Sequence, residues 1–333
     1  MGYLGLISAT MTDIINRMDP DGRIATLVEL LKQDNEILKD MTMVECNNGL
    51  SHRTTVRKTL PEVEFRHFNE GVKKSKSATI QVEDGTAMAE AYADVDKDLA
   101  MINGNTQEFR LSEDRAFIEA MNQEQARTLF YGNLEKEPKK YTGFAPRFGK
   151  LSYDNVLDYG GEGTSNTSVW LIPWGDNTVH GIYPKGSMAG LQVNDLGEQT
   201  VLDEQGGMFQ ALRSHYQWKL GLCVRDSRYI KRIANIDMSE MDKIINNGIV
   251  GSAYMEKLIR LMITAVNRLP STSSCMPVWY MNKDVKTMLD IMAMEKSNVH
   301  LAISEFEGKP VTRFLGFPIR QLGVLVNDEE RVV

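Results

Sequence analysis

One long helix organises the chain: residues 111–132 read LSEDRAFIEAMNQEQARTLFYG and are predicted to form it. Ser112 is a favourable N-cap, and the two acidic residues after it suit the positive end of the helix dipole. Its apolar stripe has helical spacing, with one glutamine in it: Phe117, Ile118, Met121, Gln125 and Leu129. The pair Gly132-Asn133 is expected to end the helix with a left-handed residue. A rod of roughly 30 Å results. The chain before it looks extended, and the chain after it looks globular.

The overall composition predicts a folded soluble protein with two compact lobes. The chain has 333 residues, of which 42% are hydrophobic and 25% charged. No apolar run reaches the ~20 residues that cross a bilayer, and no signal peptide is recognisable, so no membrane partner is expected. Three widely spaced cysteines argue against a disulfide framework and for a reducing compartment. The net charge of −7 works against general affinity for nucleic acid.

The segment before the helix has the two-residue period of half-exposed strands, so residues 51–95 are predicted to form a long β-hairpin. Polar residues alternate with two apolar sets, Val63 and Phe65, then Ala78, Ile80 and Val82. A polar, basic loop at residues 69–77 separates the two strands. The second strand continues with a face of methyl groups: Ala87, Ala89, Ala91 and Ala93. Because a lone hairpin is marginal in water, it is expected to lie against its own body or a neighbouring chain.

Both ends of the chain beyond the hairpin and helix have simpler patterns. Residues 1–50 carry too little apolar surface for a domain and are interpreted as an arm, with a helix at 23–40. After the long helix, residues 169–174 and 179–183 flank turn residues and predict a second hairpin. Further elements are a strand over 216–225, helices over 239–248, 258–269 and after Asn282, and a short buried strand over 278–281. This mixture predicts an α+β fold.

A search for catalytic or metal-binding constellations finds none. The five histidines are not at the spacing of helical zinc sites: His52, His67, His180, His215 and His300. His180 and His215 lie in strand patterns and are predicted to be hydrogen-bonded structural residues. The three cysteines have no histidine near them in sequence: Cys46, Cys223 and Cys275. No Gly-x-Ser-x-Gly elbow is present. We therefore predict no catalytic, cofactor-binding or metal-binding residue, no cofactor, and no enzyme activity.

Three polar segments have alternative interpretations. The glycine-rich residues 160–165 could cradle a phosphate through backbone N–H groups, but they lack the P-loop Lys-Ser/Thr, which favours a surface loop. The basic run Arg225–Arg232 could bind nucleic acid. The isoleucines within and after that run favour instead a charged strand edge at an interface. Glu329 and Glu330 are expected to be exposed terminal charges.

Several segments, in this order, resemble tailed-bacteriophage major capsid proteins of the Hong Kong 97 type. They are AYADVDK at 91–97 followed by the long helix, VWLIPWG with HGIYPKG between 169 and 186, QWKLGLCVRD with RIANI between 217 and 236, and GFPIR at 316–320. Their order and spacing, more than any single motif, carry the resemblance to the shell proteins of short-tailed phages. In similar chains an Asp often follows the Pro-Ile-Arg segment, whereas Gln321 stands here.

The resemblance implies a Hong Kong 97-like capsid fold divided into named parts. These are an N-terminal arm (1–50), an extended β-hairpin loop (51–95), a peripheral domain (96–238) with the spine helix (111–131), an axial domain (239–314) and a C-terminal return to the peripheral domain (315–333). It also implies a major capsid protein whose pentamers and hexamers form an icosahedral shell around double-stranded DNA, without sequence-specific binding. The implied partners are copies of itself, a separate scaffolding protein, a portal and a decoration or cement protein. The implied location is the virion capsid, assembled in the host cytoplasm.

Three other functions remain open from the sequence. An encapsulin-like nanocompartment shell has the same fold and encloses enzymes. An α+β enzyme would have a dispersed active site, against which the long exposed hairpin argues. A nucleic-acid-binding module would use the basic run Arg225–Arg232. Size-exclusion chromatography separates the shell proteins, which form capsomers or megadalton particles, from a small oligomeric enzyme.

Overall fold

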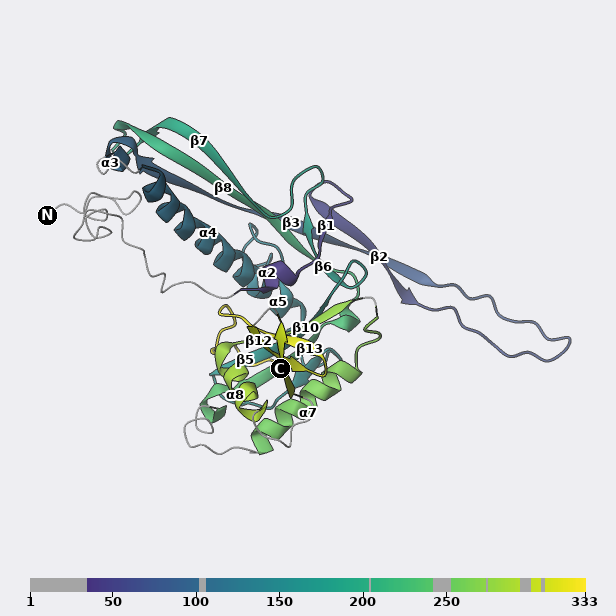
Figure 1. Ribbon diagram of the computed structural model, residues 1–333. Coiled ribbons are helices and arrows are strands. Elements are labelled where there is room, and N and C mark those ends of the chain that lie inside the picture. Colours follow the sequence, from purple (N-terminus) through teal and green to yellow (C-terminus); the bar gives the residue numbers. More distant parts are fainter. Residues whose placement is uncertain are drawn as a thin grey trace.

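The computed structural model describes residues 35–101, 106–203, 205–241, 253–273, 275–293, 301–306 and 309–333. Figure 1 shows three parts. One is a lobe that carries helices α7 (Ala253–Asn267) and α8 (Lys283–Ala293). The second is a long layer in which helix α4 (Thr106–Tyr131) runs beside strands β3 (Ala78–Asp96), β7 (Leu191–Leu202) and β8 (Met208–Val224), and the third is a thin hairpin that projects away from both. None of the described helices combines the length and the apolar character that crossing a membrane requires.

Helix α4 spans Thr106–Tyr131 and confirms the predicted long helix. Ser112 lies inside this helix, so the predicted N-cap is wrong. Met121, Gln125 and Leu129 of the predicted stripe are buried, whereas Ile118 is exposed. The difference arises because the C-terminal half of α4 packs into the molecular core while its N-terminal half lies on a sheet.

The sheet under α4 is built from β3 (Ala78–Asp96), β7 (Leu191–Leu202) and β8 (Met208–Val224). β8 lies between the other two and pairs antiparallel with both. The alanine face of β3 packs against α4, where Phe117 stacks on Tyr216 with the ring centroids 5.5 Å apart. The methyl face therefore meets the chain's own helix. Strand β7 was not predicted, because its exposed, polar side chains leave no apolar period.

The extended hairpin is paired only at its root. Strand β2 (Ser51–Thr59) forms an antiparallel ladder with β3 that ends at the pair Thr59–Ala78. Residues 60–77, called the hairpin tip below, continue beyond the ladder and turn at Phe68–Asn69. The predicted strand at Val63–Phe65 is therefore wrong: its residues have the alternation of a strand but no strand partner within the described chain.

Strand β5 (Asn166–Trp174) is buried over its whole length and separates two hydrophobic cores. On one face, Trp170, Ile172 and Trp174 pack with α4 and with α5 (Phe144–Arg147). On the other face, Val169 and Leu171 pack with α7 and α8. The alternation follows from the two-residue period of a strand. The sequence shows it as a continuous apolar run, as expected when both faces are covered.

The predicted hairpin between residues 169–174 and 179–183 is wrong. Strand β6 (Val179–Tyr183) meets β5 only at the pair Trp174–Val179. It pairs instead with β8 in antiparallel and with β1 (Met43–Glu45) in parallel orientation. The edges of β5 are occupied by β9 (Lys231–Asp237) and β10 (Met276–Met281). The backbone groups of the buried strand β5 find their hydrogen-bond partners on β9 and β10, so the short turn between β5 and β6 does not make these two strands pair beyond Trp174–Val179.

The α7/α8 lobe confirms the helical stripes predicted from the sequence. Helices α7 (Ala253–Asn267) and α8 (Lys283–Ala293) bury their apolar faces in one core. Asn282 caps α8, because its Oδ1 accepts the Val285 N–H at 2.8 Å. The other elements are α2 (Ile37–Asp40), α3 (Lys97–Met101), β4 (Val156–Asp158), a 3-10 turn (Ser227–Tyr229), β11 (Leu301–Phe306), β12 (Lys309–Phe314) and β13 (Phe317–Gln321). The predicted helices at 23–40 and 239–248 lie largely outside the described residues.

Candidate assembly surfaces and the centre that supports them

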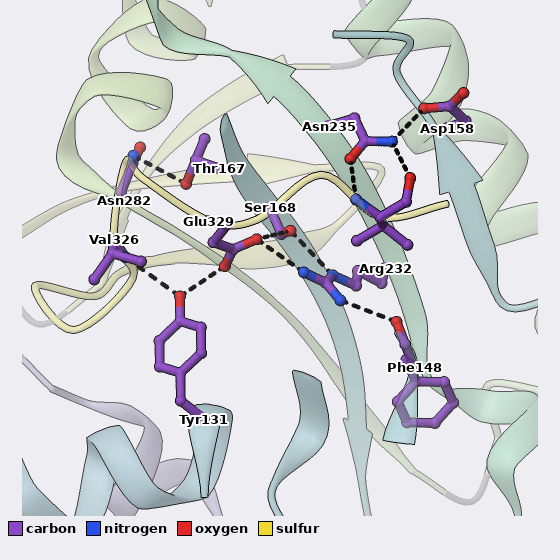
Figure 2. Close-up of polar contacts among 11 residues, drawn as sticks. Tyr131, Phe148, Asp158, Thr167, Ser168, Arg232, Asn235, Asn282, Val326 and Glu329 are labelled. Atoms are coloured by element: carbon purple, nitrogen blue, oxygen red, sulfur yellow. Dashed lines mark hydrogen bonds and ion pairs between the residues drawn. The ribbon is translucent and has the colours of Figure 1, made fainter. Parts of the chain in front are cut away.

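An ion pair lies at the centre of the molecule, where β5, β9 and the C-terminal segment meet (Figure 2). Arg232 on β9 donates to Glu329 across 2.8 Å, and the two side chains are only 4% and 5% exposed. Ser168 on β5 accepts a hydrogen bond from Arg232 at 3.0 Å and donates one to Glu329. A third guanidinium nitrogen reaches the Phe148 carbonyl at 2.9 Å. Both charges are therefore satisfied without solvent.

Helix α4 joins this centre through its last residue. The Tyr131 hydroxyl donates to Glu329 at 2.6 Å and accepts the Val326 N–H at 3.3 Å (Figure 2). Burial, followed by the negative charge of Glu329, raises the pKa of Tyr131, so the phenol remains a donor. The Arg232 guanidinium also lies 4.9 Å from the centre of the Trp170 ring. The network thus holds helix α4, two central strands and the C-terminal segment together.

The C-terminal segment is held at a second point. The side chain of Asn235 donates to the Val332 carbonyl at 2.9 Å and accepts the Val332 N–H at 2.8 Å (Figure 2). Asn235 has a φ of 60°, which asparagine tolerates better than most residues. Because this side chain satisfies both backbone groups of Val332, it acts as one residue of a strand partner would.

Two sequence predictions are corrected by this centre. Glu329 was expected to be an exposed terminal charge and is buried, because the C-terminal segment folds back over β5 and β9. The strand containing Arg232 was expected at a sheet edge, yet β9 lies between β4 and β5. No local pattern could have revealed the pair, since the sequence places Arg232 and Glu329 almost a hundred residues apart.

The basic run Arg225–Arg232 does not form a cationic patch. Arg228 pairs with Asp226 at 2.7 Å, and Lys231 is buried and donates to Asn155 at 2.8 Å. Burial lowers the pKa of Lys231. With Arg232 in the buried centre, these cations are engaged by oxygens of the same chain, which removes the main support for the nucleic-acid-binding alternative.

The glycine-rich loop also uses its backbone within the chain. The Gly160 N–H donates to Asp158 at 2.8 Å, and the Gly161 N–H donates to the Asn235 carbonyl at 2.8 Å. A Cβ at Gly161 would lie 2.5 Å from that carbonyl oxygen. The glycine there is explained by close packing against β9, and these two N–H groups are not free for a phosphate.

Among the described histidines and cysteines, His180 lies in a close group with other potential metal ligands, and Cys46 packs with Cys223 in a small apolar cluster. His215 contacts Glu90 at 2.5 Å and stacks on Tyr92, which confirms its predicted structural role. His180 is buried, as a structural residue is expected to be. The Gly175 backbone lies near its ring, but neither ring nitrogen makes a hydrogen bond of good geometry, so the predicted hydrogen bonding is not confirmed. His180 lies close to His52 and Cys223. His67 lies in the hairpin tip, and His300 lies outside the described residues.

The hairpin tip is the most exposed apolar surface among the described residues. Its large apolar side chains have little contact with the rest of the chain: Leu60 is 75%, Val63 87%, Phe65 105% and Phe68 97% exposed. Basic side chains at Arg66, Lys73, Lys74 and Lys76 accompany them. Exposed apolar groups of this size are typical of surfaces that bind another macromolecule. The tip is therefore the candidate assembly surface.

The root of the hairpin is firmly attached, unlike its tip. The buried carboxylate of Asp84 on β3 pairs with Arg147 at 2.7 Å. The Leu50 carbonyl accepts two hydrogen bonds from Thr86, one from the backbone at 3.1 Å and one from the side chain at 2.8 Å. A rigid root fixes the direction in which the tip projects, which a contact with a neighbouring molecule requires.

Comparisons with known proteins agree with this arrangement. The family described as major capsid protein GP7 matches residues 19–333. The cryo-EM structure of bacteriophage Epsilon15 contains a chain with 32% identity and a TM-score of 0.77, and the match covers 100% of this chain and 99% of that one. More distant likenesses include the capsid of the native GTA particle (11% identity, 63% and 92% covered, TM-score 0.44) and the SrpI encapsulin of Synechococcus elongatus PCC 7942 (11%, 64% and 91%, 0.43). Among curated proteins, none matches.

Proposed function

Since this chain belongs to the family of GP7 major capsid proteins and has the Hong Kong 97-like fold, we propose that its pentamers and hexamers close an icosahedral shell around double-stranded DNA. It is the major capsid protein of a phage, and its structural role argues against an enzyme. The encapsulin likeness, at 11% identity, does not support the nanocompartment alternative. Our proposal concerns the pentamers and hexamers of the shell, the double-stranded DNA that it encloses and the further partner proteins.

The observation that carries the proposal is the bare hairpin tip on its rigid root. A closed shell requires each subunit to bind several neighbours through heterologous contacts that close by symmetry. Specific interfaces usually bury more than about 1,000 Å². The tip offers aromatic and aliphatic area that the isolated chain does not use, at a distance from the lobe. It is therefore suited to lie over a neighbouring subunit.

The division into parts given by the resemblance is proposed for this chain. It comprises the arm (1–50), the extended loop (51–95), the peripheral domain (96–238) with spine helix 111–131, the axial domain (239–314) and the C-terminal return (315–333). The α7/α8 lobe supports an axial role for 239–314. Strand β5 contributes side chains to both hydrophobic cores, so the proposed peripheral and axial domains would share this strand.

The proposed partners follow from the same role. The net charge of −7 supports a wall that encloses DNA without binding it tightly, because affinity for nucleic acid grows with the phosphates neutralised. A separate scaffolding protein, a portal and a decoration or cement protein complete the proposed set, with assembly in the host cytoplasm.

Removing the hairpin tip tests the proposal. Because Thr59 and Ala78 are paired, an Asn-Gly turn in place of residues 60–77 closes the ladder as a short hairpin. The variant is expected to keep the circular dichroism and melting temperature of the wild type, yet to remain as free subunits or capsomers in size-exclusion chromatography. Closed particles of normal size and stability in electron micrographs of this variant would contradict the proposal.

A further inference from the structure

Three potential metal ligands converge at the root of the extended hairpin. His52 comes from β2, His180 from β6 and Cys223 from β8, and their ligand atoms all lie within 4.8 Å of one another. His180 and Cys223 are partners in the antiparallel β6–β8 ladder. The His52 ring meets His180 edge-on, with the ring centroids 5.5 Å apart. These residues lie far apart in sequence, so spacing rules for zinc sites do not detect them.

The two imidazoles of this group lack hydrogen bonds of good geometry, while the Cys223 thiol lies beside the Asp84 carboxylate. His180 is 1% exposed and Cys223 is 0% exposed, whereas His52 is half-buried. Both ring nitrogens of His180 and the Nδ1 of His52 lack a well-formed hydrogen bond within the described chain. Buried polar groups in folded proteins are nearly always partnered. A buried imidazole without a hydrogen bond of good geometry, next to a second imidazole and a thiol, is therefore a candidate metal ligand.

We propose that His52, His180 and Cys223 bind one zinc ion. Imidazole nitrogen and thiolate sulfur are the ligands that zinc uses most in proteins, and hard cations such as magnesium and calcium prefer oxygen. Zinc ligands at about 2.0–2.3 Å from the metal lie roughly 3.5 Å from one another, so small side-chain rotations bring this group to coordination distance. Three protein ligands leave the fourth tetrahedral position for water on the half-buried His52 side.

The ion would connect three strands at the place where the hairpin leaves the body. His52 lies opposite Asp84 in the β2–β3 ladder, and Asp84 is already paired with Arg147. Zinc would add a link from β2 to β6 and β8, which the backbone ladders do not join to β2. The effect on shell assembly rests on the proposed function, whereas metal binding itself does not.

Metal stoichiometry tests the site directly. The purified full-length chain, with its thiols reduced, is equilibrated with micromolar zinc, dialysed and analysed by inductively coupled plasma mass spectrometry. We expect one zinc per wild-type chain, and at least a tenfold weaker affinity in Cys223→Ser and His52→Asn. The matched controls Cys275→Ser and His67→Asn are expected to bind as the wild type does.

A spectroscopic measurement identifies the ligands. Cobalt in place of zinc is expected to give an intense tetrahedral d–d spectrum and a thiolate charge-transfer band, and Cys223→Ser is expected to lose that band. Less than about a tenth of a zinc per wild-type chain overturns the proposal, and so does unchanged zinc binding in folded Cys223→Ser or His52→Asn. Should Cys223→Ser fail to fold, the half-buried His52→Asn decides. If the wild type binds zinc and the His52→Asn variant does not, yet that variant assembles normally, the metal site is supported and has no role in shell assembly.

Discussion

At the residue scale, the buried pair of Arg232 and Glu329 is the most consequential contact. Its charges are complemented by Ser168, Tyr131 and a backbone carbonyl, so each nitrogen and each oxygen of the two charged groups has a hydrogen-bond partner. A buried pair of this kind adds little to stability over an apolar substitute, but breaking it leaves one charge uncompensated. The stability of the folded chain therefore depends on keeping both Arg232 and Glu329.

Replacement of Glu329 by glutamine is expected to lower the free energy of unfolding by about 3 kcal/mol, because the Arg232 guanidinium then stays buried without a counter-charge. The loss is measured by urea denaturation followed through tryptophan fluorescence. The neighbouring Glu330→Gln changes an exposed charge and is expected to stay within about 0.5 kcal/mol of the wild type.

A double substitution distinguishes the charge from the packing. Arg232→Met added to Glu329→Gln removes the stranded charge, so the double variant is expected to be more stable than Glu329→Gln alone. Equal destabilisation by Glu329→Gln and Glu330→Gln would show that the buried pair is not what holds the C-terminal segment.

At the element scale, strong local periodicity predicted the long helix, the helices α7 and α8 and the buried strand β10. The predictions that were wrong concern strand pairing, which depends on tertiary contacts. The tip alternates at Val63 and Phe65 but has no partner strand in the chain, and β6 pairs with β8 and β1 because β5 already has two partners. The pair of Arg232 and Glu329 and the group around His180 join residues distant in sequence. Periodicity reports which face is apolar, and it does not report which element covers that face.

The end of α4 is also determined by a tertiary contact that the sequence pattern does not reveal. Gly132 does not adopt a left-handed conformation. It is required because an added Cβ would lie 2.5 Å from both the Thr128 and the Tyr141 carbonyl oxygens. Gly132→Ala is therefore expected to destabilise the protein by about 1–3 kcal/mol, as overpacking does, and to lower its melting temperature.

A second glycine provides the control. A Cβ at Gly85 meets nothing within 4 Å, and its φ is not in the left-handed region. Gly85→Ala is expected to melt within about a degree or two of the wild type. If the two variants melted alike, the close approach of the loop to the end of α4 would not be the reason for Gly132.

At the scale of the whole molecule, stability and assembly reside in different places. The two cores on either side of β5, together with the ion pair, hold the isolated chain, whereas the hairpin tip contacts almost nothing. Substitutions in the tip should therefore leave folding unchanged and alter only the contacts between copies. This separation distinguishes a shell subunit from a self-contained enzyme, whose large apolar side chains serve its own core.

Phe65 and Phe68 provide the sharpest test of that separation. Both side chains are essentially fully exposed, so Phe65→Ser with Phe68→Ser is expected to leave the melting temperature of the free subunit unchanged. Burial of each ring on a neighbour would contribute about 2 kcal/mol per contact, and the contribution recurs at every subunit of the shell. The double variant should therefore need a far higher concentration to assemble, as measured by light scattering. The matched control, Lys73→Ser with Lys74→Ser in the same tip, removes charge instead of apolar area and should assemble much closer to the wild type. Assembly of the phenylalanine variant at the wild-type concentration would mean that the tip's apolar surface is not buried in the shell.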